Sequence, residues 1–551
     1  MKTITWDLED TPIKFPKEVK HIFYKVFIYN RKNFTLWVDK ISKKNQNDID
    51  WWSTLPSLRD PYTNNLLNYI SVIDTISKIK FKNLKIITRS YEMKRILEKN
   101  FKNKKLNIKV TNKKEKLNVI SNFLKSIIFQ IVIYFYINIF FKKKKIEKSQ
   151  KITLVDTFIT LNRKQNLGYY PKDIKNFIGK SNLKILIVPT FVPTLNIFKL
   201  FKIINNLPEK KDNYLFKEHY IQISDLFFSF FHIFRRNKFL KEKFNYKKID
   251  LSELIYKEIK NYGDFNSIII GILNYKFFNR LYENDINIFK SINWFENQIV
   301  DKGWNLGFRY FFRKFEHNSF GYQDFNKHFN LINHSPSENE NKSKVTPNNV
   351  IVISKSFIRV TKEFYRKQKI TVGESWRFKK ILNLKIKTLN KRNKILFILC
   401  GVKQIDEQLL KMAIEICLKN TKIKIYIKDH PILDLKKIRS LSGLPKNLIV
   451  LYGELQRILN QCFVAITSGP SSAILESACM NTPLILPEIE PGVKENMKIL
   501  NLNRNNVFIV KSASEILKKV IFIKKNLKKF KFKKIDFLNP KSKKLIQIIS
   551  N

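Results

Sequence analysis

Two groups of polar residues in the last third of the chain are of types that can hold a phosphate. His430 follows the apolar run at 424–428 and precedes a proline. Gly469, Ser471 and Ser472 follow a second apolar run, at 463–467. An imidazole can donate a hydrogen bond to a phosphate oxygen or protonate a leaving phosphate, and hydroxyls at a helix start favour an anion. Each feature alone also fits a loop histidine or a helix cap, but the two together favour a phosphate site.

A regular alternation of strand-like and helix-like segments positions these residues. Strand-length apolar runs occur at 394–400, 424–428, 448–451, 463–467 and 483–486, and amphipathic patterns between them include 406–420, 454–460 and 473–480. This alternation predicts a Rossmann-like parallel sheet, in which ligands bind beyond the carboxyl ends of the strands. Both polar groups therefore fall where a ligand site is expected.

The first two thirds of the chain are less regular. Runs at 85–88, 184–189 and 350–354 are strand candidates, which predicts a second α/β region. The polar run at 333–349 is expected to be a surface loop, and the Lys/Asn-rich stretch at 385–393 is expected to be a linker. We therefore expect an N-terminal domain over 1–384, enlarged by helical insertions, and a C-terminal Rossmann-like domain over 394–551.

The segment 424–487 resembles a known family. With KDHP at 428–431 and TSGPSSAILESACMNTPLILP at 467–487, it is similar to the C-terminal half of GT-B glycosyltransferases. More narrowly, it resembles sialyltransferases, capsule Kdo transferases and CDP-glycerol glycerophosphotransferases. The resemblance implies two Rossmann-like domains facing a cleft and a nucleotide-sugar donor whose phosphate is held by His430, Ser471 and Ser472, beside Gly469. Glu476 resembles the acidic residue that binds the donor ribose, although a glutamate on a helix surface would look the same.

Motifs upstream point to a pathway. WFENQ at 294–298, FGYQDF at 320–325 and SPSENE at 335–340 resemble a group of bacterial surface-carbohydrate biosynthesis proteins with O-antigen and lipopolysaccharide associations. SLRDP at 57–61 is compatible with that group. The resemblance implies that the acceptor is a glycan or a lipid-linked glycan.

A transfer that inverts the configuration at the anomeric carbon also needs a base on the acceptor side. Glu296 is the first candidate because it follows an apolar and aromatic run, where partial burial raises the pKa of a carboxyl group. Asp301 and Asp324 are the alternatives. Arg377, in GESWRF, could face the interdomain cleft and neutralise a diphosphate, or form a surface salt bridge.

Other chemistries lack their motifs. An isolated Asp-x-Asp at 48–50 lies in a loop-like context, and no His/Cys cluster has metal-ligand spacing, so no metal is expected. Phosphate-binding and dinucleotide-binding glycine motifs and the hydrolase nucleophile elbow are also absent from the sequence. The nucleotide sugar would be a substrate, and no cofactor is expected.

The charge is unusual for a chain of 551 residues, since 104 Lys and Arg oppose 46 Asp and Glu and leave a net charge of +58. Of the basic residues 17 are arginine and 87 are lysine, whereas nucleic-acid readers use arginine heavily, so no nucleic-acid partner is expected. Part of the surplus fits an A/T-rich coding sequence. The remainder suits phosphorylated substrates and an anionic membrane surface.

Two apolar segments bear on the membrane. The run at 127–141 is followed by four lysines at 142–145, and a second patch lies at 226–236. The first run is shorter than the ~20 residues needed to span a bilayer and fits an interfacial helix, although a buried core helix or a span would read similarly. We expect a cytoplasmic protein that is peripheral on the inner face of the cytoplasmic membrane.

These observations together favour a metal-independent, GT-B type glycosyltransferase of surface polysaccharide biosynthesis. Two alternatives stay open: a non-hydrolysing nucleotide-sugar epimerase, and a non-enzymatic polyanion-binding protein on the same fold. An assay without acceptor distinguishes the epimerase, and a steep salt dependence distinguishes the polyanion binder.

Overall fold

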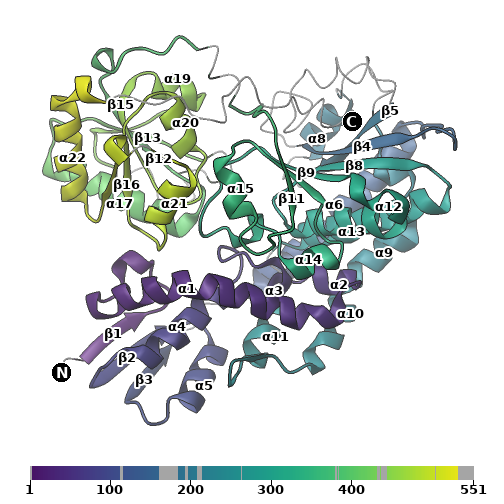
Figure 1. Ribbon diagram of the computed structural model, residues 1–551, viewed down its shortest axis with the longest axis horizontal. Helices are drawn as coiled ribbons and strands as arrows, with labels where there is room; N and C mark the ends of the chain where they lie inside the picture. Colours follow the sequence, from purple (N-terminus) through teal and green to yellow (C-terminus); the bar gives the residue numbers. More distant parts are fainter. Residues whose placement is uncertain are drawn as a thin grey trace.

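The computed structural model describes residues 3–530 except 112–115, 160–183, 193–196, 206, 208–213, 262–263, 379–380, 382–383, 431–432, 434, 436–443 and 503. Within these residues the chain forms two six-stranded sheets and one three-stranded sheet, all parallel, with one short antiparallel hairpin (Figure 1). The expected α/β class is confirmed.

The C-terminal sheet has the strand order β14-β13-β12-β15-β16-β17. The chain starts in the middle, winds to one edge and returns to the other, which is the Rossmann order. Helices α17 and α22 pack on one face, and α19, α20 and α21 pack on the other. The strands are β12 (Lys394–Ile398), β13 (Ile425–Lys428), β14 (Leu448–Val450), β15 (Cys462–Thr467), β16 (Leu484–Pro487) and β17 (Val507–Val510); the helices are α17 (Lys403–Lys419), α19 (Leu455–Leu459), α20 (Ala473–Cys479), α21 (Val493–Ile499) and α22 (Ala513–Lys525).

The middle sheet has the order β11-β10-β9-β8-β4-β5 and winds in the same way around β4 and β8. Tyr214 adds an isolated parallel bridge to Ile187 of β5. Helices α12 and α13 pack on one face, and α6 and α8 pack on the other. The strands are β4 (Ile152–Ile159), β5 (Lys184–Phe191), β8 (Ile288–Trp294), β9 (Ser319–Gln323), β10 (Asn349–Val352) and β11 (Lys369–Val372); the helices are α6 (Lys116–Phe140), α8 (Ile197–Asn205), α12 (Phe265–Glu283) and α13 (Ile299–Phe311).

The three-stranded sheet lies at the N-terminus and contains β1 (Thr3–Asp7), β2 (Asn83–Thr88) and β3 (Leu106–Val110). The long helix α1 (Lys17–Ser42) runs beside both larger sheets (Figure 1). The remaining elements are α2 (Ile49–Trp52), α3 (Leu55–Leu58), α4 (Leu66–Lys78), α5 (Tyr91–Asn100), α9 (Ile223–Phe230), α10 (His232–Arg235), β6 (Asn245–Tyr246), β7 (Ile249–Asp250), α11 (Ser252–Lys260), α14 (Glu338–Lys342) and α15 (Ser356–Thr361).

The expectation of a surface loop at 333–349 was wrong. This segment contains α14, and Asn333, Ser337 and Glu340 are buried. Polar residues can be buried when their hydrogen bonds and charges are satisfied inside the protein. Glu340 meets this condition, because it forms ion pairs with Arg59 and Lys302.

Candidate functional site

The carboxyl ends of β12 and β13 place His430 against Gly401. Gly401 has a φ of +88°, which L residues other than glycine rarely adopt. A Cβ atom at this position would lie 2.5 Å from Nδ1 of His430, so the imidazole ring packs directly on the glycine. Pro431 lies outside the described residues. The half-buried ring therefore sits at the carboxyl edge of the sheet, and ligands of Rossmann-like domains bind beyond this edge.

The backbone of the β12–α17 turn is already occupied. The carboxylate of Asp406 accepts hydrogen bonds from the backbone N–H of Cys400 at 2.7 Å and of Gly401 at 2.8 Å. Burial raises the pKa of Asp406, and these two N–H groups oppose that rise. The turn is thus held by an internal anion, and these two N–H groups are not available to an external one. A side-chain donor near the turn could bind such an anion instead.

Arg377 supplies such a donor from the other half of the molecule. Its guanidinium lies 3.6 Å from the carboxylate of Glu476, and its side chain is 41% exposed. The pKa of His430 is lowered by burial and then by the positive charges of Arg377 and Lys428. Three residues that lie far apart in sequence, Arg377, His430 and Glu476, therefore share one electrostatic environment.

Glu476 lies on α20 and is 4% exposed. Its Oε2 atom accepts a hydrogen bond from Nε2 of Gln456 at 2.8 Å. Burial raises the pKa of Glu476, while Arg377 and Gln456 act to lower it. Gln456 was not anticipated from the sequence, because a glutamine on a short helix gives no signal there.

The loop that presents Arg377 is fixed by Asp324, which follows β9. One carboxylate oxygen of Asp324 accepts from the backbone N–H groups of Trp376 and Arg377, both at 2.8 Å. The other accepts from the hydroxyl of Ser375 at 2.5 Å. Burial raises the pKa of Asp324 in spite of these bonds. The carboxylate thus positions Arg377, a role that differs from that of an acceptor base.

The β15–α20 turn holds the remaining predicted phosphate ligands. Gly469 has a φ of +71°, and a Cβ atom there would lie 2.9 Å from Cδ1 of Ile405. Ser471 is buried, and its Oγ accepts from the backbone N–H of Ala473 at 3.2 Å. Ser472 is half-buried at the start of α20, and its hydroxyl makes no capping bond. Ser472 therefore has the more available hydroxyl, whereas that of Ser471 supports the turn.

Glu296 lies at the carboxyl end of β8, in the middle sheet. Its Oε1 atom accepts from Nε1 of Trp294 at 2.8 Å, and its backbone N–H donates to Asp301 at 3.0 Å. Asp301 also accepts from the backbone N–H of Gln298, which forms a capping box at the start of α13. Burial raises the pKa of Asp301 well above its ordinary value. Glu296 is half-buried, and its hydrogen bonds with Trp294 and Asp301 lie within the N-terminal part, apart from His430.

A segment after β9 joins the two halves, and this role could not be predicted from the sequence. Nδ2 of Asn326 donates to the backbone carbonyl of Ser471, and Nδ2 of Asn330 donates to that of Pro491, both at 3.0 Å. Between them, Nε2 of His328 lies 3.2 Å from Glu490. The loops after the strands of both sheets therefore face one another. Long-range polar contacts of this kind have no periodic signature in a sequence.

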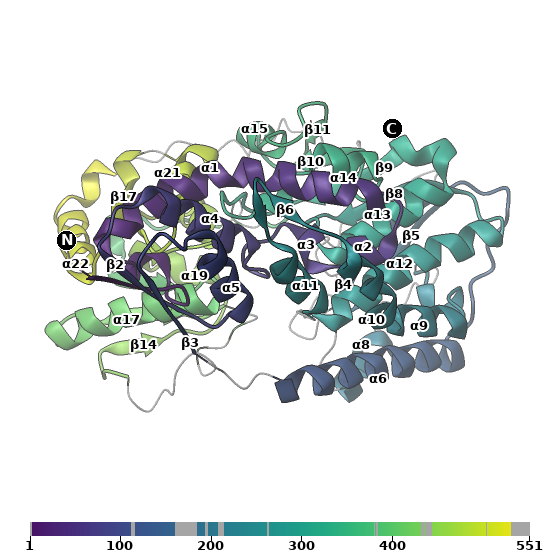
Figure 2. The same ribbon diagram turned by 90° about the horizontal axis from the view of Figure 1, so that it is seen from below.

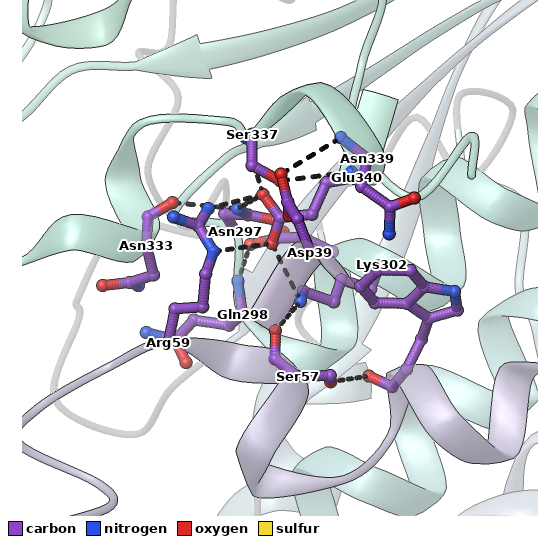
Figure 3. Close-up of polar contacts among 12 residues, drawn as sticks. Asp39, Ser57, Arg59, Asn297, Gln298, Lys302, Asn333, Ser337, Asn339 and Glu340 are labelled. Atoms are coloured by element: carbon purple, nitrogen blue, oxygen red, sulfur yellow. Dashed lines mark hydrogen bonds and ion pairs between the residues drawn. The ribbon is translucent and has the colours of Figure 1, made fainter. Parts of the chain in front are cut away.

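Three of the four upstream motifs, SLRDP, WFENQ and SPSENE, meet in one buried ionic network (Figure 3). Arg59, in SLRDP, and Lys302, on α13, both pair with the carboxylate of Glu340, in SPSENE, at 2.5 and 3.1 Å. Asn297, in WFENQ, donates to the same carboxylate at 3.1 Å. Burial acts to raise the pKa of Glu340, but Arg59 and Lys302 outweigh it and hold that pKa at about 2. These motif residues therefore join α3, the β8–α13 turn and α14.

The Asp-x-Asp pair at 48–50 takes part in ion pairs within the protein. Asp50 accepts from Nδ1 of His232 at 2.9 Å and pairs with Arg235 at 2.7 Å. These hydrogen bonds and charges outweigh burial and lower the pKa of Asp50. Among the residues the structure describes, no group of three or more His, Cys, Asp or Glu side chains is placed to hold a metal ion.

Two Rossmann-like sheets whose carboxyl ends face one another give the chain a GT-B-like architecture, as expected from the sequence. No family model matches the chain, and no curated protein matches it. Solved structures with a similar arrangement include the UDP-GlcNAc 2-epimerase of Methanocaldococcus jannaschii in complex with UDP-GlcNAc and UDP, with 13% identity over 73% of this chain and 99% of that one and a TM-score of 0.44.

Two further structures show the same kind of overlap. MurG of Acinetobacter baumannii has 11% identity over 73% of this chain and 99% of its own, with a TM-score of 0.34. The glycosyltransferase SnogD of Streptomyces nogalater has 10% identity over 69% of this chain and 96% of its own, with a TM-score of 0.33. Functional inference therefore has to rest on the residues of the site.

Proposed function

We propose that this chain is a metal-independent, GT-B type glycosyltransferase. It would move a sugar from a nucleotide-activated donor to a glycan or lipid-linked acceptor in surface polysaccharide biosynthesis. The observation that supports this proposal best is the meeting of Arg377, from the N-terminal half, with His430 and Glu476, from the C-terminal half. A cation, an imidazole and a carboxylate at the carboxyl edge of a Rossmann-like sheet suit a nucleoside diphosphate.

The donor phosphates would lie between Arg377 and His430. The guanidinium is partly exposed and its contact with Glu476 is long, at 3.6 Å, so it can turn toward an incoming phosphate. Burial and neighbouring cations lower the pKa of His430, which favours a neutral ring that donates one hydrogen bond. The hydroxyl of Ser472 would add a third donor, and Glu476 would accept from the donor ribose.

Transfer breaks the bond between the anomeric carbon and the phosphate oxygen, and the leaving phosphate keeps the electron pair. Arg377 and His430 would stabilise the charge that develops on that phosphate. The acceptor hydroxyl oxygen forms the new bond to the anomeric carbon and gives its proton to a base. We assign this base to Glu296, because the carboxylates of Asp301 and Asp324 are each held by two backbone N–H groups.

The first test is donor binding. Thermal-shift measurements with CMP-, UDP-, GDP- and CDP-linked sugars should find one nucleotide that raises the melting temperature of the full chain. Arg377→Ala and His430→Ala should each abolish that shift. Matched controls are Arg457→Ala, an arginine that is 79% exposed on α19, and His21→Ala, an exposed histidine on α1. A shift that survives in both site variants would refute the site.

The second test is turnover. The chain with its donor and an extract of lipid-linked glycans should release free nucleotide, and His430→Ala or Ser471→Ala/Ser472→Ala should not. Conversion of the nucleotide sugar without any acceptor would instead identify an epimerase. Binding that is equal for all polyanions and weakens steeply with salt would identify a polyanion-binding protein.

A further inference from the structure

One face of the molecule exposes an unusual amount of apolar surface. Ile120, Leu124, Ile128, Phe135 and Ile139 of α6 are between 48% and 69% exposed. They recur every four or seven positions, so they form one stripe along the helix. The segment Ile120–Phe140 is also the one helix, among the described residues, that is long and apolar enough to cross a membrane. Only 22% of an 18-residue window of this segment is buried inside the protein.

The opposite side of α6 is firmly packed. Phe129, Ile133 and Ile137 belong to the core on one face of the middle sheet. The side chain of Gln130 donates to Oδ1 of Asn266, on α12, at 2.8 Å, and this hydrogen bond is buried. A helix that crossed a bilayer on its own would have to break these contacts. The helix is therefore a surface element of a folded domain with one bare side.

Two neighbouring helices extend the bare side of α6. On one flank Tyr136 stacks on Phe201 of α8, with ring centroids 3.8 Å apart, and Phe198 of α8 is 80% exposed. On the other flank α6 contacts α9, and an exposed stripe continues through Ile223, Phe227 and Phe231. Figure 2 shows α6 along one edge of the molecule, with α8 and α9 beside it. We call these three helices together with α10 the apolar face.

The charge around the apolar face has one sign. The sequences of α6, α8, α9 and α10 contain a single acidic residue, Asp225, which is buried. Exposed lysines stand on α6 at Lys125 and on α8 at Lys202, and a run of four lysines follows α6 at 142–145. Aromatic and aliphatic side chains ringed by lysine match the boundary between acyl chains and anionic head groups.

We propose that the apolar face docks on an anionic lipid bilayer and that α6 lies in the plane of the interface. The stripe of α6 enters the acyl region, Phe198 and Phe227 enter on either side of it, and the lysines at 142–145 contact the head groups. The two apolar segments of the sequence thus belong to one surface. In Figure 2 this surface lies in the half of the molecule opposite to α22. The proposal is argued from exposed side chains and charge alone and does not use the proposed activity.

Flotation of the purified full-length chain with lipid vesicles tests the proposal. The chain should float with vesicles of mixed phosphatidylglycerol and phosphatidylcholine, and much less with phosphatidylcholine alone. Ile128→Glu/Phe135→Glu should weaken binding by about tenfold or more, because two exposed apolar side chains that would enter the acyl region are lost, each with its transfer free energy. Leu418→Glu is the matched control, since Leu418 is 68% exposed on α17. It should bind as the unchanged chain does.

Additional variants distinguish lipid binding from a loss of folding. Phe198→Glu, on a separate helix, should also weaken binding, and a preserved circular dichroism spectrum and melting temperature in both variants would show that folding is intact. Conversion of Lys142, Lys143, Lys144 and Lys145 to glutamine should remove the preference for phosphatidylglycerol. The proposal is overturned if Ile128→Glu/Phe135→Glu floats normally, if carbonate fails to extract the bound chain, or if the face instead mediates a lipid-independent dimer in sedimentation.

Discussion

Asp324 accepts a hydrogen bond from the backbone N–H of Arg377 at 2.8 Å, and the guanidinium of that same arginine lies 3.6 Å from Glu476. A buried carboxylate at the end of β9 therefore sets the position of a cation that reaches the C-terminal sheet. This arrangement separates two kinds of acidic residue in the candidate site. Asp324 acts through the backbone of a loop, and Glu476 faces the charge that the loop presents.

Replacement of Asp324 by asparagine should move Arg377 without removing it. An amide has one acceptor oxygen, so at least one of the three present donors would be left without a partner, at a stability cost of about 1–3 kcal/mol. We expect KM for the donor to rise about tenfold, with a smaller change in kcat. Steady-state kinetics and urea unfolding measure the two effects. Loss of stability at an unchanged KM would show that Asp324 is only structural.

Gly401 and Gly453 form a matched pair for testing the contact with His430. Both have positive φ, at +88° and +112°, but a Cβ atom at Gly453 would meet nothing within 4 Å. Alanine at either position should cost about 1–3 kcal/mol of backbone strain. Gly401→Ala alone should also displace the imidazole and abolish the donor-induced thermal shift. Equal donor binding by the two variants would contradict the placement of His430.

The buried Glu340 should be far more sensitive to substitution than its neighbour Glu338. Glu340→Gln leaves Arg59 and Lys302 buried without their counter-charge, which should cost about 3–5 kcal/mol. Glu338→Gln removes an exposed pair with Lys342, which solvent screens, and should change stability far less. Urea unfolding of both variants at neutral pH gives the comparison. Similar losses in the two would rule out a net stabilising role for the network.

The same network predicts how stability depends on pH. The folded protein holds the pKa of Glu340 at about 2, below the ordinary value for a glutamate. The contribution of this carboxylate is therefore complete above its unfolded pKa and is lost as the pH falls toward 2. The free energies of unfolding of the unchanged chain and of Glu340→Gln should differ at neutral pH and approach one another as the pH falls. A difference in the free energy of unfolding that stays constant over this pH range would show that Glu340 does not titrate in this way.

His430 should couple donor binding to proton uptake. Burial, Arg377 and Lys428 lower its pKa, so the free ring is neutral at neutral pH. A bound diphosphate would favour the charged ring, and donor affinity should rise as the pH falls from 8 toward 6. Calorimetry in two buffers of different ionisation enthalpy measures the proton taken up. His430→Gln should flatten the pH dependence of donor affinity. If the pH dependence persists in this variant, it arises from another titrating group.

The C-terminal half could be predicted from the sequence because its elements are local and strongly patterned. The run at 463–467 became β15 (Cys462–Thr467), and the run at 424–428 became β13 (Ile425–Lys428). Both end next to the predicted ligands. The strand β9 (Ser319–Gln323) was not predicted, because its sequence SFGYQ contains glycine and glutamine and lacks an apolar run.

The residues that could not be predicted from the sequence depend on contacts between distant parts of the chain. Arg59 and Glu340 are 281 positions apart, and their charges are buried only because each supplies the partner of the other. A polar segment such as 333–349 therefore looks like a surface loop until its partners are known. The same reason explains why Gln456, Asn326 and the positioning role of Asp324 were not anticipated.

The carboxylate of Asp406 has a consequence for how such a site changes during evolution. Because Asp406 already binds the N–H groups of Cys400 and Gly401, these two groups are not available to an incoming anion, and under the proposed function the side chains of Arg377 and His430 take their place. Backbone donors are present whatever the residue, but side-chain donors are replaced by a single codon change. Under the proposed function, the preference for one donor over another can therefore change by substitution of these side chains, without any alteration of the fold.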